Sequence, residues 1–315
     1  MAMQDPLNGK LVVLLGGSGF VGTHVAQALL ERGARLRIVS RNPEQAFKLK
    51  PLANLGQIQF ARCDVTRQDS LGVAMRNADA AVYLAGSFKG DLKALHATAA
   101  GKAAEFAKAE GANAFVYVSG LGADSESDAE YARTKALGEQ AVLQAFPKAT
   151  ILRPAALFGE DDAFIQMFAG LIASLPVLPV FGSDAALQPL WVDDAAEAIT
   201  NALAQPEQHG GKTYEIAGPE TITMGELHQS LAKAQGRDPL FLPVPDFASA
   251  IFAALPGTPM NSDQWSLLKA GGAASGRLPG LDALGVTPHP LDLFLDRWMV
   301  RYRKHGRFGA KNAAA

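Results

Sequence analysis

The chain has 315 residues, of which 48% are hydrophobic and 19% are charged. A chain of this length and composition buries a large core, which excludes a disordered protein and fits one large α/β domain or a nucleotide domain with a smaller partner. Its 29 basic and 31 acidic residues are mixed along the sequence, so no basic block predicts nucleic-acid binding.

Targeting signals are not visible in the sequence. Cys63 is the only cysteine, so no intramolecular disulfide can form, and MAMQDPLNGK lacks the pattern of a secretion signal. The most apolar stretch, FAGLIASLPVLPVF, has 14 residues and two prolines, whereas a membrane helix needs about 20 residues. We interpret it as core or pocket wall and predict no transmembrane segment. We expect a cytoplasmic protein.

Short apolar runs alternate with longer amphipathic segments along the first half of the chain. This alternation is typical of α/β proteins with a parallel sheet covered by helices, and right-handed crossovers make such a sheet doubly wound, as in a Rossmann fold. Strands are expected at residues 11–15, 36–40, 57–63, 80–86, 114–120 and 149–154, and helices at about 20–32, 67–77, 91–110 and 128–146.

The stretch LVVLLGGSGFVGTHVAQALLERG joins the first strand to the first helix through a glycine-rich loop. Glycines allow a tight turn and let backbone N–H groups approach a pyrophosphate at the positive end of the helix. The spacing reads as Gly-x-x-Gly-x-x-Gly from Gly16 or as Gly-x-Gly-x-x-Gly from Gly17, and the two belong to different dinucleotide-binding families. Thr23 and His24 follow Gly22, which excludes the Gly-Lys-Ser/Thr of a Walker loop.

The end of the second strand indicates which dinucleotide is bound. A site for the unphosphorylated cofactor usually has Asp or Glu there for the ribose hydroxyls, but this sequence has Ser40 and Arg41. A guanidinium can pair with a 2′-phosphate. The sequence therefore favours NADP(H), with NAD(H) as the alternative. Asp64 and Val65 follow the third strand where an adenine ring is usually capped, and LAG (84–86) ends the fourth strand.

A tyrosine and a lysine lie one helical turn apart in DAEYARTKALGEQAV. Tyr131 and Lys135 are four residues apart on a predicted helix, so their side chains leave the same face. A phenol has an ordinary pKa of about 10, and a nearby ammonium lowers that pKa, so the phenol can exchange a proton with a carbonyl. The pair follows the fifth strand, which a doubly wound sheet brings to the cofactor crevice.

After Pro154 the alternation of strands and helices loosens, and proline and glycine become frequent. Residues 187–203 and 212–218 look like a strand and helix and a further strand that return to the nucleotide domain. TMGEL has the spacing of a capping box between Thr223 and Glu226. We predict an NAD(P)-binding domain over 1–157 that 187–218 rejoins, and a smaller α/β part for substrate or partner binding over 158–186 and 219–315.

Taken together, these motifs resemble the extended branch of the short-chain dehydrogenase/reductase superfamily. YARTKALGEQAV, TILRPAALFGEDDAFI, LQPLWVDDAAEAI, TYEIAGPETITMGEL and ALGVTPHPLD further resemble the atypical subgroup around alpha-subcomplex subunit nine of mitochondrial respiratory complex I. The likeness covers nearly the whole chain. It selects the frame that starts at Gly16, with Gly17 as an accommodating extra.

The resemblance implies a role for particular residues of this sequence. The cofactor residues that it implies are Gly16, Ser18, Gly19, Phe20 and Val21 for the pyrophosphate, Arg41 for the 2′-phosphate, Asp64 and Val65 for the adenine, Ala85 and Gly86 for the ribose, Lys135 for the nicotinamide ribose and Pro154 for the nicotinamide ring.

The catalytic set departs from that of active family members, which carry a serine or threonine shortly after the fifth strand and often an asparagine in the preceding helix. Ser119 is the only serine or threonine in VYVSGLGAD, one or two positions before the expected place, where Gly120 or Leu121 stands. Thr98 aligns with the asparagine. We predict Tyr131, Lys135 and Ser119 as the catalytic residues.

Three functions fit these motifs. The first is an NADP(H)-dependent oxidoreductase that acts on a carbonyl or secondary alcohol of a small molecule. The second is a non-catalytic protein that holds NADP(H) and assembles with a larger complex. The third is a nucleotide-sugar epimerase or dehydratase, although no sugar-nucleotide clamp is visible in 160–190 or 219–315.

The histidines and the basic C-terminal stretch bear on metal and partner sites. The six histidines show no metal spacing, so no metal is predicted. The basic stretch RWMVRYRKHGR predicts a solvated terminal helix, with contact to a protein partner or the inner membrane surface as the alternative.

Overall fold

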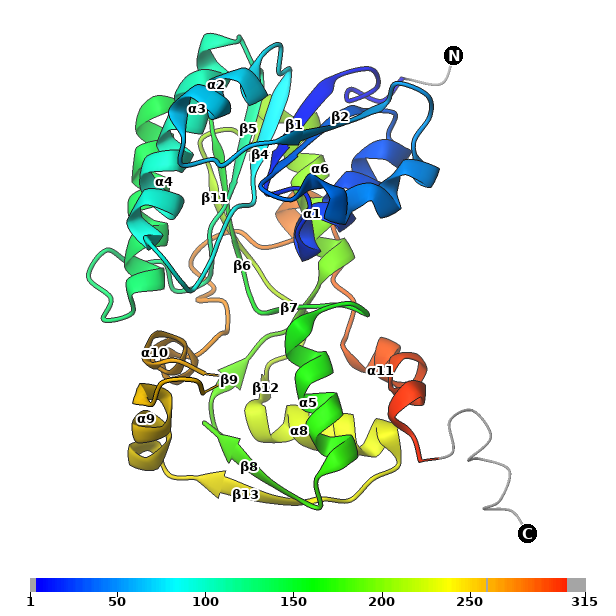
Figure 1. Ribbon diagram of the computed structural model, residues 1–315, viewed down its shortest axis with the longest axis vertical. Coiled ribbons are helices and arrows are strands. Elements are labelled where there is room, and N and C mark those ends of the chain that lie inside the picture. The colour runs from blue at the N-terminus through cyan, green and yellow to red at the C-terminus, as the bar shows by residue number, and fades with distance from the viewer. Residues whose placement is uncertain (1–3, 259, 305–315) are drawn as a thin grey trace. The chain divides into compact units, whose positions relative to one another are not determined.

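The computed structural model describes residues 4–258 and 260–304 (Figure 1). They form two compact units. Unit 1 comprises the described residues up to Pro154 with Val192–Ile216 and Ser275–Thr287. Unit 2 comprises Ala155–Trp191, Ala217–Ala274 and the described residues from Pro288 onward.

Unit 1 is built on a seven-stranded sheet in which every pairing is parallel, with the order β11-β6-β5-β4-β1-β2-β3. The strands are β1 (Leu11–Leu15), β2 (Arg35–Ser40), β3 (Ile58–Arg62), β4 (Ala80–Tyr83), β5 (Ala114–Val118), β6 (Thr150–Pro154) and β11 (Thr213–Ile216). The order reverses direction between β1 and β4. The prediction of a doubly wound Rossmann-like α/β fold is therefore confirmed, and its switch point lies where the glycine loop leaves β1.

Helices cover both faces of this sheet (Figure 1). On one face α1 packs against α6, and on the other α3 packs between α2 and α4. The helices of unit 1 are α1 (Phe20–Glu31), α2 (Gln68–Met75), α3 (Ala99–Ala109), α4 (Glu130–Ala145), α6 (Val192–Ala204) and α7 (Pro206–His209), with 3₁₀ segments η1 (Pro43–Leu52) and η3 (Asp282–Leu284) and a π-helical segment η2 (Ala94–Thr98).

Two predicted strands are shorter than expected. The strand predicted at 80–86 ends at Tyr83 and the one at 114–120 ends at Val118. β1 ends at Leu15, where Gly16 turns the chain away at φ +91°. The Leu84 N–H still donates to the Leu15 carbonyl at 2.8 Å, but beyond it β4 has no neighbouring strand to pair with. The residues past both strand ends are therefore loops, as a ligand-binding edge requires.

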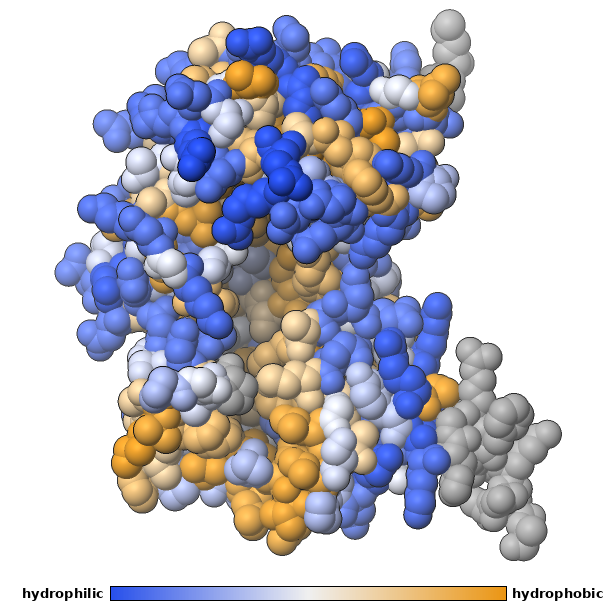
Figure 2. Space-filling view, in the orientation of Figure 1, coloured by the Kyte–Doolittle hydropathy of each residue, from blue (hydrophilic) through white to orange (hydrophobic). Residues whose placement is uncertain are grey.

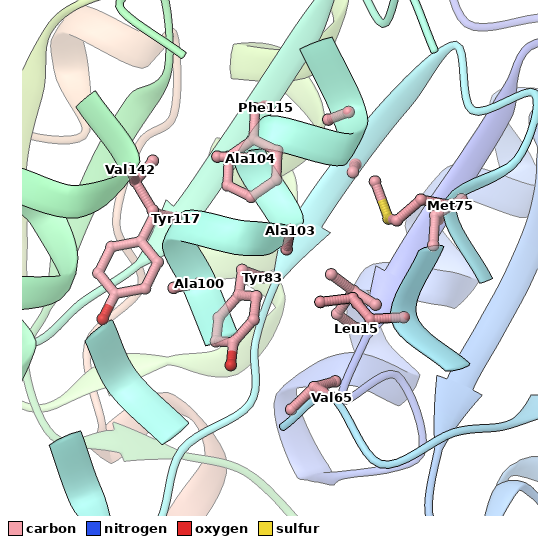
Figure 3. Packing of buried hydrophobic residues seen from close by; sticks show 14 of the residues in the cluster. Leu15, Val65, Met75, Tyr83, Ala100, Ala103, Ala104, Phe115, Tyr117 and Val142 are labelled. Carbon is pink, nitrogen blue, oxygen red and sulfur yellow. The ribbon is translucent and has the colours of Figure 1, made fainter. Parts of the chain in front are cut away.

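Small side chains on α3 let the helix approach the sheet closely (Figure 3). Ala100, Ala103 and Ala104 are buried against the aromatic rings that project from β4 and β5. Tyr83 and Tyr117, two of these rings, are fully buried. A buried phenol needs a hydrogen-bond partner, and both hydroxyls find one in the turn that precedes α3.

The turn before α3 is π-helical, and the two tyrosines hold it in place. The Tyr83 hydroxyl donates to the Leu95 carbonyl at 2.6 Å, and the Tyr117 hydroxyl donates to the His96 carbonyl at 2.9 Å. π-Helical turns are rare and are frequently found at functional sites. The sequence predicts a regular helix over 91–110, whereas this anchored turn directs His96 into the interior.

Gly138 lets α4 approach the π-helical turn closely. A Cβ atom there would overlap the His96 carbonyl and the Tyr117 hydroxyl. We therefore expect Gly138→Ala to lower the free energy of unfolding by about 1–3 kcal/mol, although alanine favours a helix. Gly170 of α5 has no atom within 4 Å of its would-be Cβ, so Gly170→Ala is the matched control and should raise stability by about 0.5–1 kcal/mol. Urea unfolding checks both, and equal effects would contradict the packing argument.

The described part of unit 2 contains three two-stranded sheets and a group of helices. β7 (Leu157–Phe158) pairs with β10 (Leu190–Trp191), β8 (Val177–Phe181) with β13 (Leu240–Val244), and β9 (Ala186–Leu187) with β12 (Ile222–Thr223). The helices are α5 (Ala163–Ser174), α8 (Met224–Gln235), α9 (Asp246–Ala254), α10 (Ser262–Ala270) and α11 (Asp292–Trp298), followed by the 3₁₀ segment η4 (Met299–Tyr302). The predicted capping box starts α8, with Thr223 and Glu226 bonded reciprocally at 3.1 and 2.7 Å.

Two sequence interpretations need correction in unit 2. The stretch FAGLIASLPVLPVF forms the end of α5 and β8, but it is not core throughout, because Leu171, Leu175 and Val177 are exposed. The basic C-terminal stretch is not a fully solvated helix, because Trp298 and Met299 are buried in the core of unit 2, and its last residues, from His305, lie outside the described residues. None of the helices in the described part of the chain is long and apolar enough to cross a membrane.

Candidate dinucleotide site and catalytic residues

The glycine loop is shaped by three close backbone approaches. Gly16 has φ +91°, and a Cβ there would lie 2.9 Å from the Ala85 backbone nitrogen. A Cβ on Gly22 would lie 2.6 Å from the Gly17 Cα, and one on Gly17 would lie 2.8 Å from the Leu14 Cβ. Gly17 is therefore a packing requirement and not the accommodating extra that we expected. The contact between Gly16 and Ala85 brings the loops after β1 and β4 together.

The start of α1 fits a pyrophosphate. Gly19 is the N-cap residue, no side chain caps the helix, and its first turn carries no acidic residue. A Cβ on Gly19 would meet nothing closer than the Gly16 carbonyl at 3.4 Å, so the loop has space on this side. Phe20 and Val21 are half-buried in the first turn. The backbone N–H groups and the positive end of the helix dipole favour an anion here.

Ser18 lies beside the end of β2. Its hydroxyl bonds to the Ser40 hydroxyl at 2.8 Å, and the Asn42 backbone N–H donates to the same Ser40 oxygen at 3.1 Å. The neighbouring residue, Arg41, is exposed. The loop after β1 and the end of β2 are therefore tied together, which keeps Arg41 beside the glycine loop.

Asp64 and Val65 follow β3, and their side chains have structural roles. The Asp64 carboxylate accepts from the Thr66 hydroxyl at 2.7 Å and from the Thr66 N–H at 3.1 Å. These bonds, with smaller contributions from the charges of Arg41 and Arg67, hold the pKa of Asp64 below its ordinary value. Val65 is buried in the main core cluster of unit 1. The structure thus brings Asp64 and Arg41 close enough to interact, while the carboxylate itself is held in a turn.

Lys135 lies in the interior of unit 1, on α4. It is 3% exposed, and its ammonium donates to the Val118 carbonyl at 2.9 Å. Burial lowers the pKa of Lys135 from 10.5 to about 8, against a smaller raising effect from Glu139. A Cβ on Gly86 would lie 3.6 Å from this ammonium, so the loop after β4 and Lys135 share one site. The predicted contact of Lys135 with the nicotinamide ribose stays a prediction, and the structure places its ammonium beside Gly86.

Tyr131 lies one turn before Lys135 on α4, between two rings. It stacks on Phe88 with ring centroids 4.4 Å apart, and the His96 ring meets it edge-on at 5.2 Å. The Lys135 ammonium is 5.6 Å from the Tyr131 ring centroid. A Cβ on Gly120 would lie 3.6 Å from the Tyr131 hydroxyl. Gly120, one of the two positions at which the resemblance implies a serine or threonine, thus lies beside this hydroxyl.

Ser119 and Pro154 lie at the ends of β5 and β6. The Ser119 side chain is 3% exposed, and its hydroxyl finds no hydrogen-bond partner among the described residues. The Pro154 carbonyl accepts from the Leu121 N–H at 3.0 Å, which fixes Pro154 beside the segment that follows β5. A buried hydroxyl without a partner is costly. Because the Ser119 oxygen is itself inaccessible to solvent, a substrate oxygen reaches it only if the segment after β5 moves.

His96 is a residue of this site that the sequence did not reveal. Its ring is fully buried, Nε2 accepts from the Ser87 N–H at 3.2 Å, and Nδ1 pairs with the Thr134 hydroxyl at 2.9 Å. Burial, followed by the charge of Lys135, lowers the pKa of His96 to about 3, so the ring is neutral at pH 7. Thr98, which we aligned with the family's asparagine, is exposed. The π-helical turn places His96, and not Thr98, beside Tyr131.

A partly buried ion pair holds α4 one turn beyond Lys135. Glu139 lies one turn after Lys135 and accepts two bonds from the Arg153 guanidinium, at 2.8 and 2.7 Å. Arg153 precedes Pro154 at the end of β6. Charged bidentate pairs are geometrically strict, so this pair sets the position of α4 against the sheet edge. The sequence motifs gave no signal for it, because its partners are 14 residues apart in the chain.

The comparisons with known proteins agree with this geometry. Residues 16–167 match a family model described as NAD(P)H-binding, and residues 123–266 match one described as an RmlD substrate binding domain. The chain is 30% identical to a ceramide reductase from Caulobacter vibrioides, over 82% of this chain and 79% of that protein. The chain belongs to the extended short-chain dehydrogenase/reductase superfamily. The predicted resemblance to this superfamily is therefore confirmed.

Other relatives within and near the superfamily extend the comparison. The chain is 29% identical to the mitochondrial NADH dehydrogenase [ubiquinone] 1 alpha subcomplex subunit 9 of Arabidopsis thaliana, over 98% of this chain and 82% of that protein. In fold it resembles an NADPH-dependent quinone oxidoreductase from Escherichia coli, solved with NADPH, with a TM-score of 0.73 and 21% identity over 90% of this chain and 98% of that one. The relatives of this chain thus include both a named reductase and a complex I subunit.

Proposed function

We propose that the protein is an NADP(H)-dependent oxidoreductase that interconverts a carbonyl and a secondary alcohol. The observation that carries this proposal is the pair of Tyr131 and buried Lys135 on α4, beside the loops that follow β4 and β5. The loop after β4 meets the glycine loop at the switch point between β1 and β4. The likeness to a ceramide reductase and to an NADPH-dependent quinone oxidoreductase supports a reductase.

In this proposal each side chain of the site has one task. The dinucleotide, when bound, supplies or accepts hydride at its nicotinamide C4. The Tyr131 hydroxyl donates its proton to the substrate oxygen during reduction and recovers it during oxidation. The Lys135 ammonium stabilises the phenolate and bonds the ribose next to the nicotinamide. Ser119 binds the substrate oxygen in place of the missing hydroxyl at Gly120, and neutral His96 holds Thr134 and the Ser87 backbone around Tyr131.

The proposed preference for NADP(H) depends on Arg41. We expect Arg41→Ala to weaken NADPH binding by about 1.5–3 kcal/mol, because a charge-assisted pair with the 2′-phosphate is lost, while NADH binding changes little. Arg35→Ala, at the opposite end of β2, is the matched control and should affect neither nucleotide. Isothermal titration with both nucleotides measures the difference. Equal losses for NADPH and NADH in Arg41→Ala would contradict the assignment.

A second function is favoured by the glycine at position 120 and by the near-full-length likeness to a complex I subunit. In that alternative the protein retains NADP(H) as a structural element and acts as an accessory or assembly partner of a larger complex, in the cytoplasm or at the inner membrane face. Size-exclusion chromatography of a lysate at native abundance tests it. A monomer-sized species that reduces carbonyls would exclude it, whereas a large assembly containing inactive protein would support it.

A further inference from the structure

Large apolar side chains gather on the outside of unit 2. α5 exposes Phe164, Met167 and Leu171, and Leu175 follows its last turn. Their spacing of three and four residues places them in one stripe along the helix. α5 therefore has apolar residues on its exposed side as well as on its buried side, and the rest of unit 2 covers only the buried side.

The stripe continues along the paired strands and the next helix. Val177 of β8 and Leu240 of β13 are register partners, and both are exposed. Phe247 and Ile251 of α9 lie one turn apart and are 70% and 61% exposed, and Leu255 follows at the helix end. β8 follows α5 in the chain and pairs with β13, which leads into α9. Figure 2 shows hydrophobic residues gathered over the lower part of unit 2, where these elements lie in Figure 1. We name the exposed apolar side chains of α5, β8, β13 and α9 the apolar face.

The apolar face carries almost no charge. Residues 163–181 include no charged residue, and Asp246 is the only one in 239–255. The Asp246 carboxylate lies 3.4 Å from the Lys269 ammonium, so it is paired. Contiguous exposed apolar surface of this kind marks an interaction site with a protein or a membrane. Contact with hydrocarbon requires this near absence of charge.

The strands of the apolar face are poorly suited to pairing with another chain. Pro179 lies in β8 and Pro243 in β13, and each lacks the N–H that a further strand would need. Proline is one of the devices that protect an exposed strand edge from edge-to-edge association. This argues against a second copy joined through these strands.

Basic residues border the apolar face next to α5. The η4 segment packs against α5, where the Tyr302 hydroxyl bonds the Gln166 side chain at 2.6 Å. From Arg297 to the C-terminus the sequence has basic residues and no acidic one. Arg301 and Arg303 are paired with carboxylates, at 3.3 and 3.2 Å, while Arg297 and Lys304 are exposed. Glu160, Asp238 and Asp296 are also exposed in this region, so the border carries both signs of charge, and its cationic excess comes from the stretch that follows Asp296. An uncharged apolar surface next to such a cationic stretch is complementary to an anionic lipid surface.

We propose that the apolar face docks the protein on an anionic membrane surface. The side chains of α9 and α5 enter the boundary between headgroups and acyl chains, and the basic border contacts the headgroups. This inference concerns unit 2 alone and does not depend on the reaction proposed for unit 1.

Vesicle sedimentation tests the docking proposal with the full chain. Native protein should sediment with vesicles of phosphatidylcholine and phosphatidylglycerol more than with phosphatidylcholine alone. Phe247→Ser/Ile251→Ser/Leu255→Ser should weaken this binding by about tenfold or more. Leu52→Ser/Leu55→Ser/Val73→Ser removes three exposed aliphatic residues of unit 1 and is the matched control. Because all six positions are exposed, both triple variants should keep the native melting temperature, which is measured alongside.

The outcomes distinguish a membrane from a second copy of the chain as the occupant of the apolar face. Loss of binding in the α9 variant with retention in the control supports docking, and a lower preference for anionic vesicles in Arg297→Gln/Lys304→Gln supports the basic border. No sedimentation of native protein, or equal sedimentation of the two triple variants, overturns the proposal. The proposal is also overturned if native protein self-associates but does not sediment with vesicles, and the α9 variant abolishes that self-association. The apolar face would then join two copies of the chain.

Discussion

Tyr131→Phe is expected to lower NADPH-dependent turnover by about 10²–10⁴-fold, because it removes the hydroxyl that exchanges a proton with the substrate. The ring itself is retained between Phe88 and His96, so the fold and NADPH binding should not change. Turnover is measured on whichever ketone, quinone or keto-lipid of a broad panel the native protein reduces. NADPH binding is measured in parallel by fluorescence titration.

Tyr302→Phe is the matched control for this prediction. It removes a hydroxyl that bonds Gln166 in unit 2 and touches no residue of the proposed site, and it should leave turnover unchanged. If Tyr131→Phe reduced carbonyls at the native rate, Tyr131 would not be the proton donor.

Lys135→Met is expected to lower turnover and NADPH affinity without lowering stability at pH 7. In the folded protein the pKa of Lys135 is lowered from 10.5 to about 8 by burial. The charged lysine therefore destabilises the fold below pH 8, and this cost disappears as the pH rises toward 10.5. Removing the buried charge should therefore stabilise the fold by about 3 kcal/mol at pH 7. This gain is offset by a loss of about 1–3 kcal/mol, because methionine leaves the Val118 carbonyl without its hydrogen-bond donor. A buried charge kept at such a cost is typical of a functional residue.

The pH dependence separates this role of Lys135 from a structural one. Between pH 8 and 10.5 the unfolding free energy of native protein should rise relative to that of Lys135→Met, and native NADPH affinity should fall as the ammonium loses its proton. Lys102→Met removes a half-exposed lysine paired with Glu105 at 2.7 Å and should show neither effect. The measurements are urea unfolding and NADPH titration across this pH range. A variant that is several kcal/mol less stable at pH 7 would indicate a packing role instead.

The parts of the molecule that the sequence predicts are those set by local pattern and chain order. The strand LVVLL, the glycine loop and the following helix are contiguous, so one stretch of sequence specifies all three. Tyr131 and Lys135 lie on one helical turn after the fifth strand, and the alternation of strands and helices sets the sheet order. These features follow from residues near one another in the chain.

The parts that the sequence misses depend on contacts between distant residues. His96 points inward because the Tyr83 and Tyr117 hydroxyls hold a π-helical turn and Gly138 lets α4 approach it. No local pattern encodes that combination, so an alignment by helix position selected Thr98. Gly17 looked dispensable because its contact with Gly22 exists only once the loop is folded.

The apolar face was misjudged for a related reason. A run such as FAGLIASLPVLPVF predicts burial by composition, but composition does not say whether the chain supplies a cover for every apolar side of α5. The structure shows the cover on one side, where Ile165, Ala169 and Ile172 are buried, and exposes the other. Hydrophobic residues can therefore be counted from sequence, but which of them remain outside is decided by the packing of the whole unit.

Deuteride transfer tests the central claim most directly. Purified protein is loaded with NADPH that carries deuterium at the transferable C4 position and is incubated with small-molecule and lipid extracts, and products are analysed by mass spectrometry. The proposed oxidoreductase should place deuterium on the carbinol carbon of a discrete product, and Tyr131→Phe should abolish that label while still binding NADPH. Tight NADPH binding without label transfer to any product would contradict the claim and identify a protein that only holds its nucleotide.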